Sequence, residues 1–411
     1  MAHFFYICTF IAMEQLTGKT LVFTDHHFGV KGNSPSRQKI GAMAIKDILD
    51  AISAYSIKNI IFCGDYFHQR NALTVDTLNI AYRCLQALAK KCNVYMVLGN
   101  HDLFNKNSTD INSINIFRDN ASIIVVDSPT EVSMNGKHAL LVPWLSDLSR
   151  YSNGQFDFMF GHFDISSKFL IANYAQEHSR KVRTTGIASK EIDNDGLLDS
   201  SRSISCSPEQ YLGSFIDLVH ENGTIFAGHI HQHKEMTVHK RKFIFVGTPY
   251  EQNLGDIGCK CGFYVIDEDG SYKFVENANL PKHVQFICSK VKEAGIDNYD
   301  FSLAKENIVQ KVYDIDISME DDLKINQKIA SFKPYEELLP DYQVALDFAK
   351  EDISSAQGNL VNMLKKSKLD YVKSYIEQLD NAALEADGID KAKLFSIMNK
   401  YYLAAIGDDE Q

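Results

Sequence analysis

The 411-residue chain carries a formal net charge of −11, because 53 Asp and Glu residues outnumber 42 Lys and Arg residues. This balance excludes a protein that holds nucleic acid by bulk electrostatic attraction, although a local basic groove or bound cations can still receive phosphates. The length exceeds the size at which a single hydrophobic core stops growing, so two or three domains are expected. The eight cysteines form no CxxC pair, which favours free thiols in a reducing compartment.

Strands alternate with helices in the first hundred residues. The apolar runs TLVFTD, NIIFCGD and NVYMVLGN are separated by amphipathic helical patterns near residues 37–56 and 73–91. Short apolar runs that alternate with such helices are typical of β-α-β units. The apolar stripes of the two helices are therefore predicted to belong to the core.

Strands dominate after residue 120, with the runs SIIVVD, HALLVPW, FDFMFGH, TIFAGHI, KFIFVGT and GFYVIDED. Together with the first part of the chain, they predict an α/β sandwich of two sheets flanked by helices. A polar segment at 163–210 interrupts the series and is interpreted as a surface insertion. Its DNDG sequence at 193–196 lacks the remaining ligands of a calcium loop.

The chain after residue 281 restarts with HVQFICSKV, KVYDIDIS and a charged helical pattern near 319–332, which predict a small α/β appendage. Residues from about 352 to 405 are polar and helical with an apolar stripe. That stripe needs a surface to pack on, which is either this protein's own core or another protein. The opening MAHFFYICTFIAM lacks a basic leader and is too short to span a bilayer, so we expect no membrane association.

Five short polar motifs stand at the ends of predicted strands. They are Asp25-His26-His27, Gly64-Asp65, Gly99-Asn100-His101-Asp102, Gly161-His162 and Gly228-His229-Ile230-His231. In α/β sheets, ligands bind in the crevice beyond the carboxyl ends of the strands, so these side chains can converge on one site. Imidazoles with carboxylates and an amide oxygen suit Mn²⁺, Zn²⁺ or Fe²⁺, and the absence of thiolate speaks against a structural zinc.

In the D-x-H and H-x-H motifs, the spacing indicates which residues can be metal ligands. Side chains alternate along a strand, so Asp25 and His27 are expected to point the same way, as are His229 and His231. A single histidine after a strand is usually a structural residue, but five motifs in this order favour a metal site. The residues expected not to be ligands are His26 and Ile230.

The ordered set D-x-H, GD, GNHD, GH and GHxH resembles the calcineurin-like metallophosphoesterases over roughly residues 20–250. The segment GDYFHQR has His68 and Gln69 where protein Ser/Thr phosphatases have an Asp and a phosphate-binding Arg, and GNHD replaces their GNHE. With DHHFG, LVPW at 141–144 and GTP at 247–249, the motifs look like the SbcD-type exonucleases, especially bacteriophage recombination nuclease subunits. The long insertion after His162 departs from the compact phage pattern.

The resemblance implies a fold and a metal site. The fold is an α/β calcineurin-like two-sheet β-sandwich flanked by helices over 14–280, then a small α/β capping domain over 281–350 and a helical partner-binding segment over 351–411. Two divalent ions, for which Mn²⁺ is the best candidate, would clamp the attacking and departing oxygens of an in-line phosphoryl displacement. The implied ligands are Asp25, His27, Asp65 and His231 around one ion, and Asp65, Asn100, His162 and His229 around the other. Asp65 would then bridge the two metal ions.

Two histidines are implied as catalytic. His101 would face the phosphate and protonate the leaving 3′ oxygen, with Asp102 as its orienting partner, and His68 would be the second phosphate contact. Both could instead be structural groups behind the metal ligands. His233 could contact substrate, although a plain surface role is favoured.

The resemblance implies a metal-dependent DNA nuclease with exonuclease and endonuclease activity, in an SbcCD-type recombination and repair complex. It would be a cytoplasmic homodimer, in the host cytoplasm if phage-encoded, whose C-terminal helices bind an SMC-like ATPase of the SbcC type. The alternative is a calcineurin-like phosphatase or nucleotide phosphodiesterase, and the GDYFH and GNHD sequences weigh against a protein phosphatase. A non-catalytic scaffold would be expected to have lost ligands, and none is missing from the motifs.

Overall fold

The structure is a computed structural model, and it describes residues 13–105, 108–163 and 215–342. The predicted insertion beyond residue 163 and the predicted helical segment at 351–411 lie outside the described residues. The chain divides into two compact units. Of the described residues, unit 1 comprises those up to 285 together with 300–310 and 327–338, and unit 2 comprises 286–299, 311–326 and 339–342.

A six-stranded sheet in unit 1 has the order β13-β12-β2-β3-β4-β5. Its strands are β2 (Thr20–Phe23), β3 (Asn59–Phe62), β4 (Asn93–Val97), β5 (Ile123–Val126), β12 (Gly262–Ile266) and β13 (Tyr272–Glu276). Strands β2 to β5 are parallel, whereas β12 is antiparallel to both of its neighbours. The helices between them are α1 (Val30–Asn33), α2 (Pro35–Tyr55) and α3 (Val75–Ala89), so the predicted β-α-β units are confirmed.

A seven-stranded sheet has the order β1-β6-β7-β8-β9-β11-β10. Its strands are β1 (Glu14–Leu16), β6 (Thr130–Met134), β7 (Lys137–Val142), β8 (Phe156–Gly161), β9 (Val219–Ala227), β10 (Lys234–Val238) and β11 (Arg241–Phe245). The four strands β7, β8, β9 and β11 run parallel, so the carboxyl ends of β8 and β9 lie at the same edge.

A third sheet joins β14 (His283–Ile287), β15 (Ile308–Tyr313), β16 (Glu336–Glu337) and β17 (Asp341–Tyr342). The helix expected near 319–332 is α7 (Met319–Ser331), and α6 (Cys288–Ala294) follows β14 directly. Short 3₁₀ helices complete the described elements: η1 (Ser113–Phe117), η2 (Ile216–Leu218), η3 (Leu254–Asp256) and η4 (Ser302–Ala304). Within the described ranges, no helix combines the length and apolarity needed to span a bilayer.

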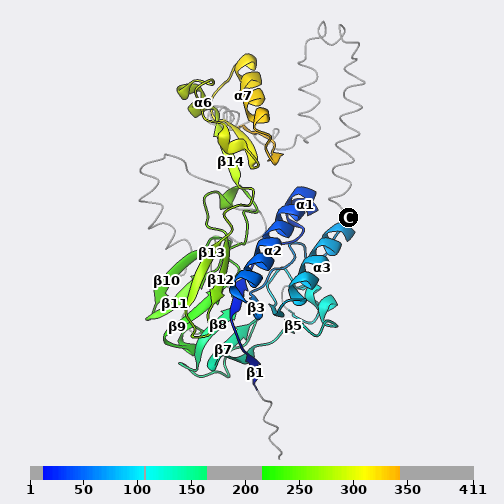
Figure 1. Cartoon of the computed structure of the whole chain (residues 1–411), viewed down its shortest axis with the longest axis vertical. Helices are drawn as coiled ribbons and strands as arrows, with labels where there is room; N and C mark the ends of the chain where they lie inside the picture. The colour runs from blue at the N-terminus through cyan, green and yellow to red at the C-terminus, as the bar shows by residue number, and fades with distance from the viewer. Residues whose placement is uncertain (1–12, 106–107, 164–214, 343–411) are drawn as a thin grey trace, which may run out of the picture. The chain divides into compact units, whose positions relative to one another are not determined.

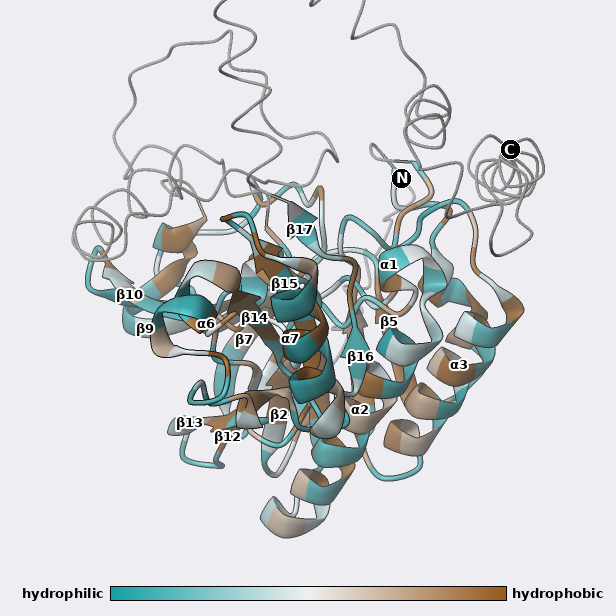
Figure 2. Ribbon diagram, turned by 90° about the horizontal axis from the view of Figure 1, so that it is seen from above, coloured by the Kyte–Doolittle hydropathy of each residue, from teal (hydrophilic) through white to brown (hydrophobic). Residues whose placement is uncertain are grey.

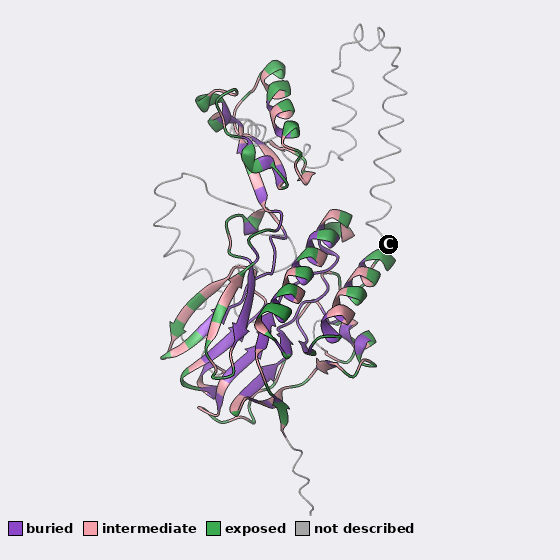
Figure 3. Cartoon of the chain, viewed as in Figure 1, coloured by how far each residue is buried: buried purple, intermediate pink, exposed green. Residues whose placement is uncertain are grey.

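The central strands are buried on both faces, which explains their continuous apolar sequences. Leu21 and Phe23 of β2 pack in the core formed with α2 and α3, whereas Val22 faces the core between the two sheets. The same alternation in β3 and β4 makes a helix–sheet–sheet arrangement, with α2 and α3 side by side on one face (Figure 1). The central strands of both sheets are buried, whereas edge strands such as β10 and β13 are partly exposed, and the two helices keep their exposed residues on their outer sides (Figure 3). The predicted two-sheet α/β sandwich is therefore confirmed.

The two long helices have clear start and stop signals. Pro35 occupies the first turn of α2, and Ser56 ends that helix in the left-handed conformation. The hydroxyl of Thr74 caps α3 by accepting a hydrogen bond from the Thr77 backbone N–H. Hydrophilic and hydrophobic bands alternate along both helices, as expected of elements that bury one face (Figure 2).

Candidate metal centre

The predicted ligands follow the carboxyl ends of five strands in the two facing sheets. Strand β2 ends at Phe23, β3 at Phe62, β4 at Val97, β8 at Gly161 and β9 at Ala227, and each is followed within four residues by a predicted ligand. Parallel strands end at one edge, so the loops that carry these ligands meet there.

The backbone at the ligands is not extended, which corrects the argument from strand alternation. Four of the predicted ligands have positive φ angles: Asp25 at 50°, His27 at 53°, Asp65 at 61° and His229 at 81°. Side chains other than glycine rarely adopt this left-handed conformation, and it costs of order 1 kcal/mol or more per residue. The direction of these side chains is therefore set by left-handed backbone conformations in the loops beyond the strands, and not by alternation along a strand.

Three groups of side chains have the geometry to hold a metal ion, with all ligand atoms of each group within 4.8 Å of one another, and two of these groups contain a carboxylate. One group is Asp25, His27 and His231, and the other is Asp65, His162 and His229. Asp65 lies between the groups, since its Oδ2 is 3.7 Å from His27 Nε2 and 3.2 Å from His162 Nε2. A carboxylate in this position can serve both groups.

Hydrogen bonds behind the ligands fix their orientation. His162 Nδ1 lies 2.8 Å from the Cys63 carbonyl oxygen, which can only accept, so Nδ1 carries a proton and Nε2 faces the centre. The Asp25 carboxylate accepts hydrogen bonds from the Thr24 hydroxyl at 2.8 Å and the His229 backbone N–H at 3.0 Å. These contacts hold the donor atoms in place before any ion binds.

The Asp65 carboxylate in the centre is ionised, whereas the His162 ring has to release a proton before its Nε2 can bind a metal ion. Burial lowers the pKa of His162, but the Asp65 carboxylate outweighs burial and raises that pKa to about 9. Burial alone would raise the pKa of Asp65, yet the neighbouring imidazoles hold it well below its usual range. Burial lowers the pKa of His27 to about 3 and that of His229 to about 4, which keeps both imidazoles neutral as metal ligands must be.

Asn100, a predicted ligand, lies beside the second group. With its amide oxygen turned inward, Oδ1 lies 2.9 Å from His162 Nε2 and 3.1 Å from His229 Nδ1. With the amide reversed, Nδ2 takes that place and Oδ1 accepts a hydrogen bond from Arg70 Nη2 at 3.0 Å. The inward-turned oxygen also lies 3.2 Å from Asp65 Oδ2, and a cation would stabilise these two oxygens once His162 has lost its Nε2 proton.

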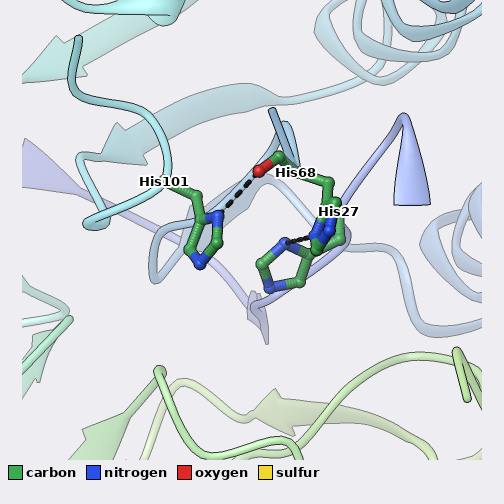
Figure 4. A group of neighbouring side chains, drawn as sticks. All are labelled: His27, His68 and His101. Carbon is green, nitrogen blue, oxygen red and sulfur yellow. Dashed lines mark hydrogen bonds between the residues drawn. The ribbon is translucent and has the colours of Figure 1, made fainter. Parts of the chain in front are cut away.

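A third group contains His27, His68 and His101 (Figure 4). His68 Nδ1 lies 3.3 Å from His27 Nδ1, and the His68 carbonyl oxygen lies 2.7 Å from His101 Nδ1. The His68 and His101 rings are stacked with centroids 5.4 Å apart. His68 therefore contacts Nδ1 of the predicted ligand His27 and the ring of His101, the predicted general acid.

Asp102 does not have the predicted orienting role. Its buried carboxylate accepts hydrogen bonds at 2.9 Å from the backbone N–H groups of Asp65, Tyr66 and Gly99. The contact to His101 Nδ1 comes instead from the His68 carbonyl oxygen. Asp102 thus ties the loop after β3 to the loop after β4, because a carboxylate can satisfy several backbone donors at once.

Two of the histidines considered in the sequence analysis, His26 and His233, lie outside the three groups. His26 is buried against Phe28, Tyr66 and Tyr250, in keeping with the expectation that it is not a ligand. His233 stacks on Phe274 with ring centroids 4.1 Å apart, and its Nδ1 lies 3.2 Å from the Phe245 carbonyl oxygen. It is half-buried rather than a plain surface residue.

Two glycines allow the loops to approach this closely. A Cβ atom at Gly99 would lie 2.2 Å from Asp65 Oδ1 and 2.4 Å from the Asp65 backbone nitrogen. A Cβ atom at Gly64 would lie 2.4 Å from His162 Nδ1, and Gly64 also has a φ of 98°. No side chain fits at either position without displacing a predicted ligand.

The sequence analysis missed two neighbours of the centre. One is Arg70, which lies beside Asn100. The sequence comparison with protein phosphatases aligns Gln69 with their phosphate-binding Arg and assigns no role to Arg70. Trp144 ends the LVPW run at 141–144, and its ring centroid lies 5.1 Å from that of His229 and 5.8 Å from that of His162. The signal for Arg70 was its position as the basic residue of the GDYFHQR motif.

The profile of one protein family, described as calcineurin-like phosphoesterase, matches residues 18–233, which is more than half of the chain. The chain belongs to this family. Calcineurin-like phosphoesterases hydrolyse phosphoester bonds and depend on metal ions, and the Asp and His groups described above could bind metal. The predicted family membership is therefore confirmed.

Two individual proteins resemble this calcineurin-like phosphoesterase. Exonuclease subunit 1 of Enterobacteria phage T4 is 24% identical over 268 residues, which cover 63% of this chain and 68% of the phage protein. A solved structure described as a novel archaeal phosphodiesterase shares 10% identity, and the match covers 63% of this chain and 99% of the archaeal one. Its TM-score of 0.30 is too low to bear on the fold or the function.

Proposed function

We propose that the chain is a metal-dependent DNA nuclease, with exonuclease and endonuclease activity, that works as a subunit of an SbcCD-type recombination and repair complex. The observation that carries a phosphodiesterase mechanism is the Asp65 carboxylate between two groups of Asp and His side chains. The 24% identity to a phage exonuclease subunit, over two thirds of its length, supports the choice of a nuclease among the phosphoesterases.

The proposed mechanism uses two divalent ions, for which Mn²⁺ is the best candidate given nitrogen and oxygen donors without thiolate. One ion would be held by Asp25, His27, Asp65 and His231, and the other by Asp65, Asn100, His162 and His229. When bound, such ions supply Lewis acid polarisation of the phosphate and a nucleophile at neutral pH. The protein's own contribution is to hold these side chains before substrate arrives.

His101 is the proposed general acid. Its Nδ1 lies 2.7 Å from the His68 carbonyl oxygen, and this contact requires a proton on Nδ1. Nε2 can therefore donate only from the doubly protonated ring, which gives up one proton to the leaving 3′ oxygen. The phosphate contact by His68 stays a prediction, and its 3.3 Å contact with His27 supports the alternative role of orienting that ligand.

Linear duplex DNA with Mn²⁺ tests the proposed activity on the full chain, beside p-nitrophenyl phosphate, a dinucleotide phosphodiester and a phosphopeptide. We expect metal-dependent DNA cleavage that EDTA abolishes and added Mn²⁺ restores. Rapid turnover of the phosphopeptide or the dinucleotide without DNA cleavage would instead establish the alternative, a phosphatase or nucleotide phosphodiesterase.

We also propose the remaining organisation: a nuclease domain over 14–280, a capping domain over 281–350 that positions DNA, and a helical segment over 351–411 that binds an SMC-like ATPase. The protein would act as a homodimer in the cytoplasm. The helical segment lies outside the described residues, and an apolar stripe in its sequence supports the proposal. A monomeric mass by analytical ultracentrifugation would contradict the homodimer.

Truncation after residue 350 is expected to preserve metal content and basal nuclease activity while removing ATP-dependent stimulation by the partner. The reason is that 351–411 supplies no predicted ligand and carries an apolar stripe suited to a coiled-coil surface. Co-purification with the cognate ATPase, before and after truncation, measures the loss. A much lower melting temperature of the truncated chain would show that the segment packs on the protein's own core. Undiminished affinity for the ATPase would show that the partner binds elsewhere on the chain.

A further inference from the structure

Arg70 lies at the edge of the metal centre without an acceptor for part of its guanidinium group. It belongs to the loop between β3 and α3, directly after the segment that carries Asp65 and His68. Its Nε is buried and has no hydrogen-bond partner among the described residues. Its Nη2 lies 3.0 Å from a terminal atom of the Asn100 amide.

The charge of Arg70 is also unpaired within the part of the chain that the structure describes. The carboxylates near the centre are otherwise engaged: Asp25 and Asp65 with histidines, and Asp102 with backbone N–H groups. A guanidinium group offers five N–H donors in a rigid, planar fork. A half-buried cation with a free donor is suited to an anionic ligand, because arginine binds phosphate oxygens in a bidentate manner.

The Asn100 amide strengthens this conclusion. If Oδ1 faces the metal ligands, Nδ2 lies 3.0 Å from Arg70 Nη2, and two hydrogen-bond donors face each other. If the amide is reversed, Arg70 gains the Asn100 oxygen as acceptor, but the metal group loses that oxygen. If Asn100 binds a metal ion through Oδ1, then Asn100 Nδ2 and Arg70 Nη2 both lack an acceptor. A single acceptor from outside the protein could serve both donors, because the two nitrogens are neighbours.

We propose that Arg70 binds a non-bridging oxygen of the scissile phosphate and that Asn100 Nδ2 donates to the same oxygen. This inference rests on the proposed function, since it takes Asn100 as a ligand through Oδ1. Arg70 is then a substrate-binding residue, and the ligand class is a phosphate diester or any tetrahedral phosphate anion. Its guanidinium group binds the phosphate beside Asn100 and transfers no proton.

Binding of inorganic phosphate to the Mn²⁺-loaded full-length protein tests the inference directly. Isothermal titration calorimetry of Arg70→Gln should show phosphate affinity reduced by about ten- to a hundredfold, the range for loss of a charge-assisted hydrogen bond. Arg70→Lys keeps the charge without the fork and should be intermediate. Arg83→Gln removes an exposed arginine of α3 and should match the wild type.

Steady-state kinetics on a phosphodiester provide the second measurement: Arg70→Gln should raise KM and the inhibition constant of phosphate by similar factors. Metal content and melting temperature should stay at wild-type values. Unchanged phosphate affinity in metal-loaded Arg70→Gln would overturn the inference, as would loss of metal, which would make Arg70 a structural clamp on Asn100. Should Arg70→Gln not fold, wild-type phosphate affinity in Arg70→Lys would overturn it equally.

The two proposals can fail separately. If the wild type binds phosphate through Arg70 but cleaves no DNA, the proposed nuclease function is wrong and the assignment of Arg70 to phosphate binding is retained. If the wild type cleaves DNA and both Arg70 variants bind phosphate normally, the nuclease stands and the assignment of Arg70 is wrong.

Discussion

Asp65→Ala is expected to abolish hydrolysis and to lower the metal content of the protein more than the loss of any single histidine ligand. Asp65 Oδ2 lies 3.7 Å from His27 Nε2 in one group and 3.2 Å from His162 Nε2 in the other. Without this carboxylate, two cations would face each other with their mutual repulsion unscreened. His231→Ala is the matched comparison, because His231 belongs to one group alone.

Metal content by inductively coupled plasma mass spectrometry and turnover on DNA measure the effect. Asp65→Asn provides a control for folding, since an amide oxygen can still accept the hydrogen bond that Asp65 Oδ1 receives from the His101 backbone N–H at 2.7 Å. Two ions per chain in Asp65→Ala would contradict the shared-ligand assignment. A larger defect in His231→Ala than in Asp65→Ala would contradict it as well.

Trp144 gives an independent optical signal for the same experiment. It is the single tryptophan of the chain, and its ring centroid lies 5.1 Å from that of His229. Paramagnetic Mn²⁺ bound by the second group should quench its fluorescence, and EDTA should restore the signal. In Asp65→Ala the quenching should require a much higher Mn²⁺ concentration.

His101→Asn is expected to keep both metal ions and to lose about 10² to 10⁴-fold in turnover on DNA, the usual contribution of general acid catalysis. His101 is not among the two ligand groups formed around Asp25 and Asp65, so metal affinity should be unchanged. The defect should shrink on a p-nitrophenyl ester of a nucleotide, because p-nitrophenolate leaves without needing a proton.

His239→Asn is a suitable control for His101→Asn. His239 is exposed in the turn between β10 and β11 and already has a positive φ of 47°, a conformation that asparagine tolerates well. It should behave as wild type. Equal losses of His101→Asn on DNA and on the p-nitrophenyl ester would show that His101 positions the substrate, and full turnover on DNA would make it a structural residue.

The fold could be predicted because its central strands carry a strong local signal. Leu21 and Phe23 pack toward the helices while Val22 packs toward the second sheet, so β2 must be apolar on both faces. The identity of the clustered residues was equally accessible, since donors that follow parallel strands meet at one sheet edge whatever the loops do in detail.

The geometry within the site could not be predicted from sequence. The alternation rule was extended beyond the end of β2, where Asp25 and His27 in fact adopt left-handed backbone conformations set by tertiary contacts. The role of Asp102 depends on the loop after β3 lying against the loop after β4, a contact between residues far apart in sequence. The neighbours of Asn100 depend on the same contact between loops.

The close approach at Gly64 and Gly99 bears on how related chains should be judged. In a relative that keeps every Asp and His but carries alanine at the position of Gly99, the added methyl group would occupy the space of the Asp65 carboxylate and backbone nitrogen. No rotamer change could relieve that overlap, because part of it is with main chain. Such a chain would pass a search for metal ligands and yet be unable to bring them together, so the missing side chain at this position is itself a marker of catalytic competence.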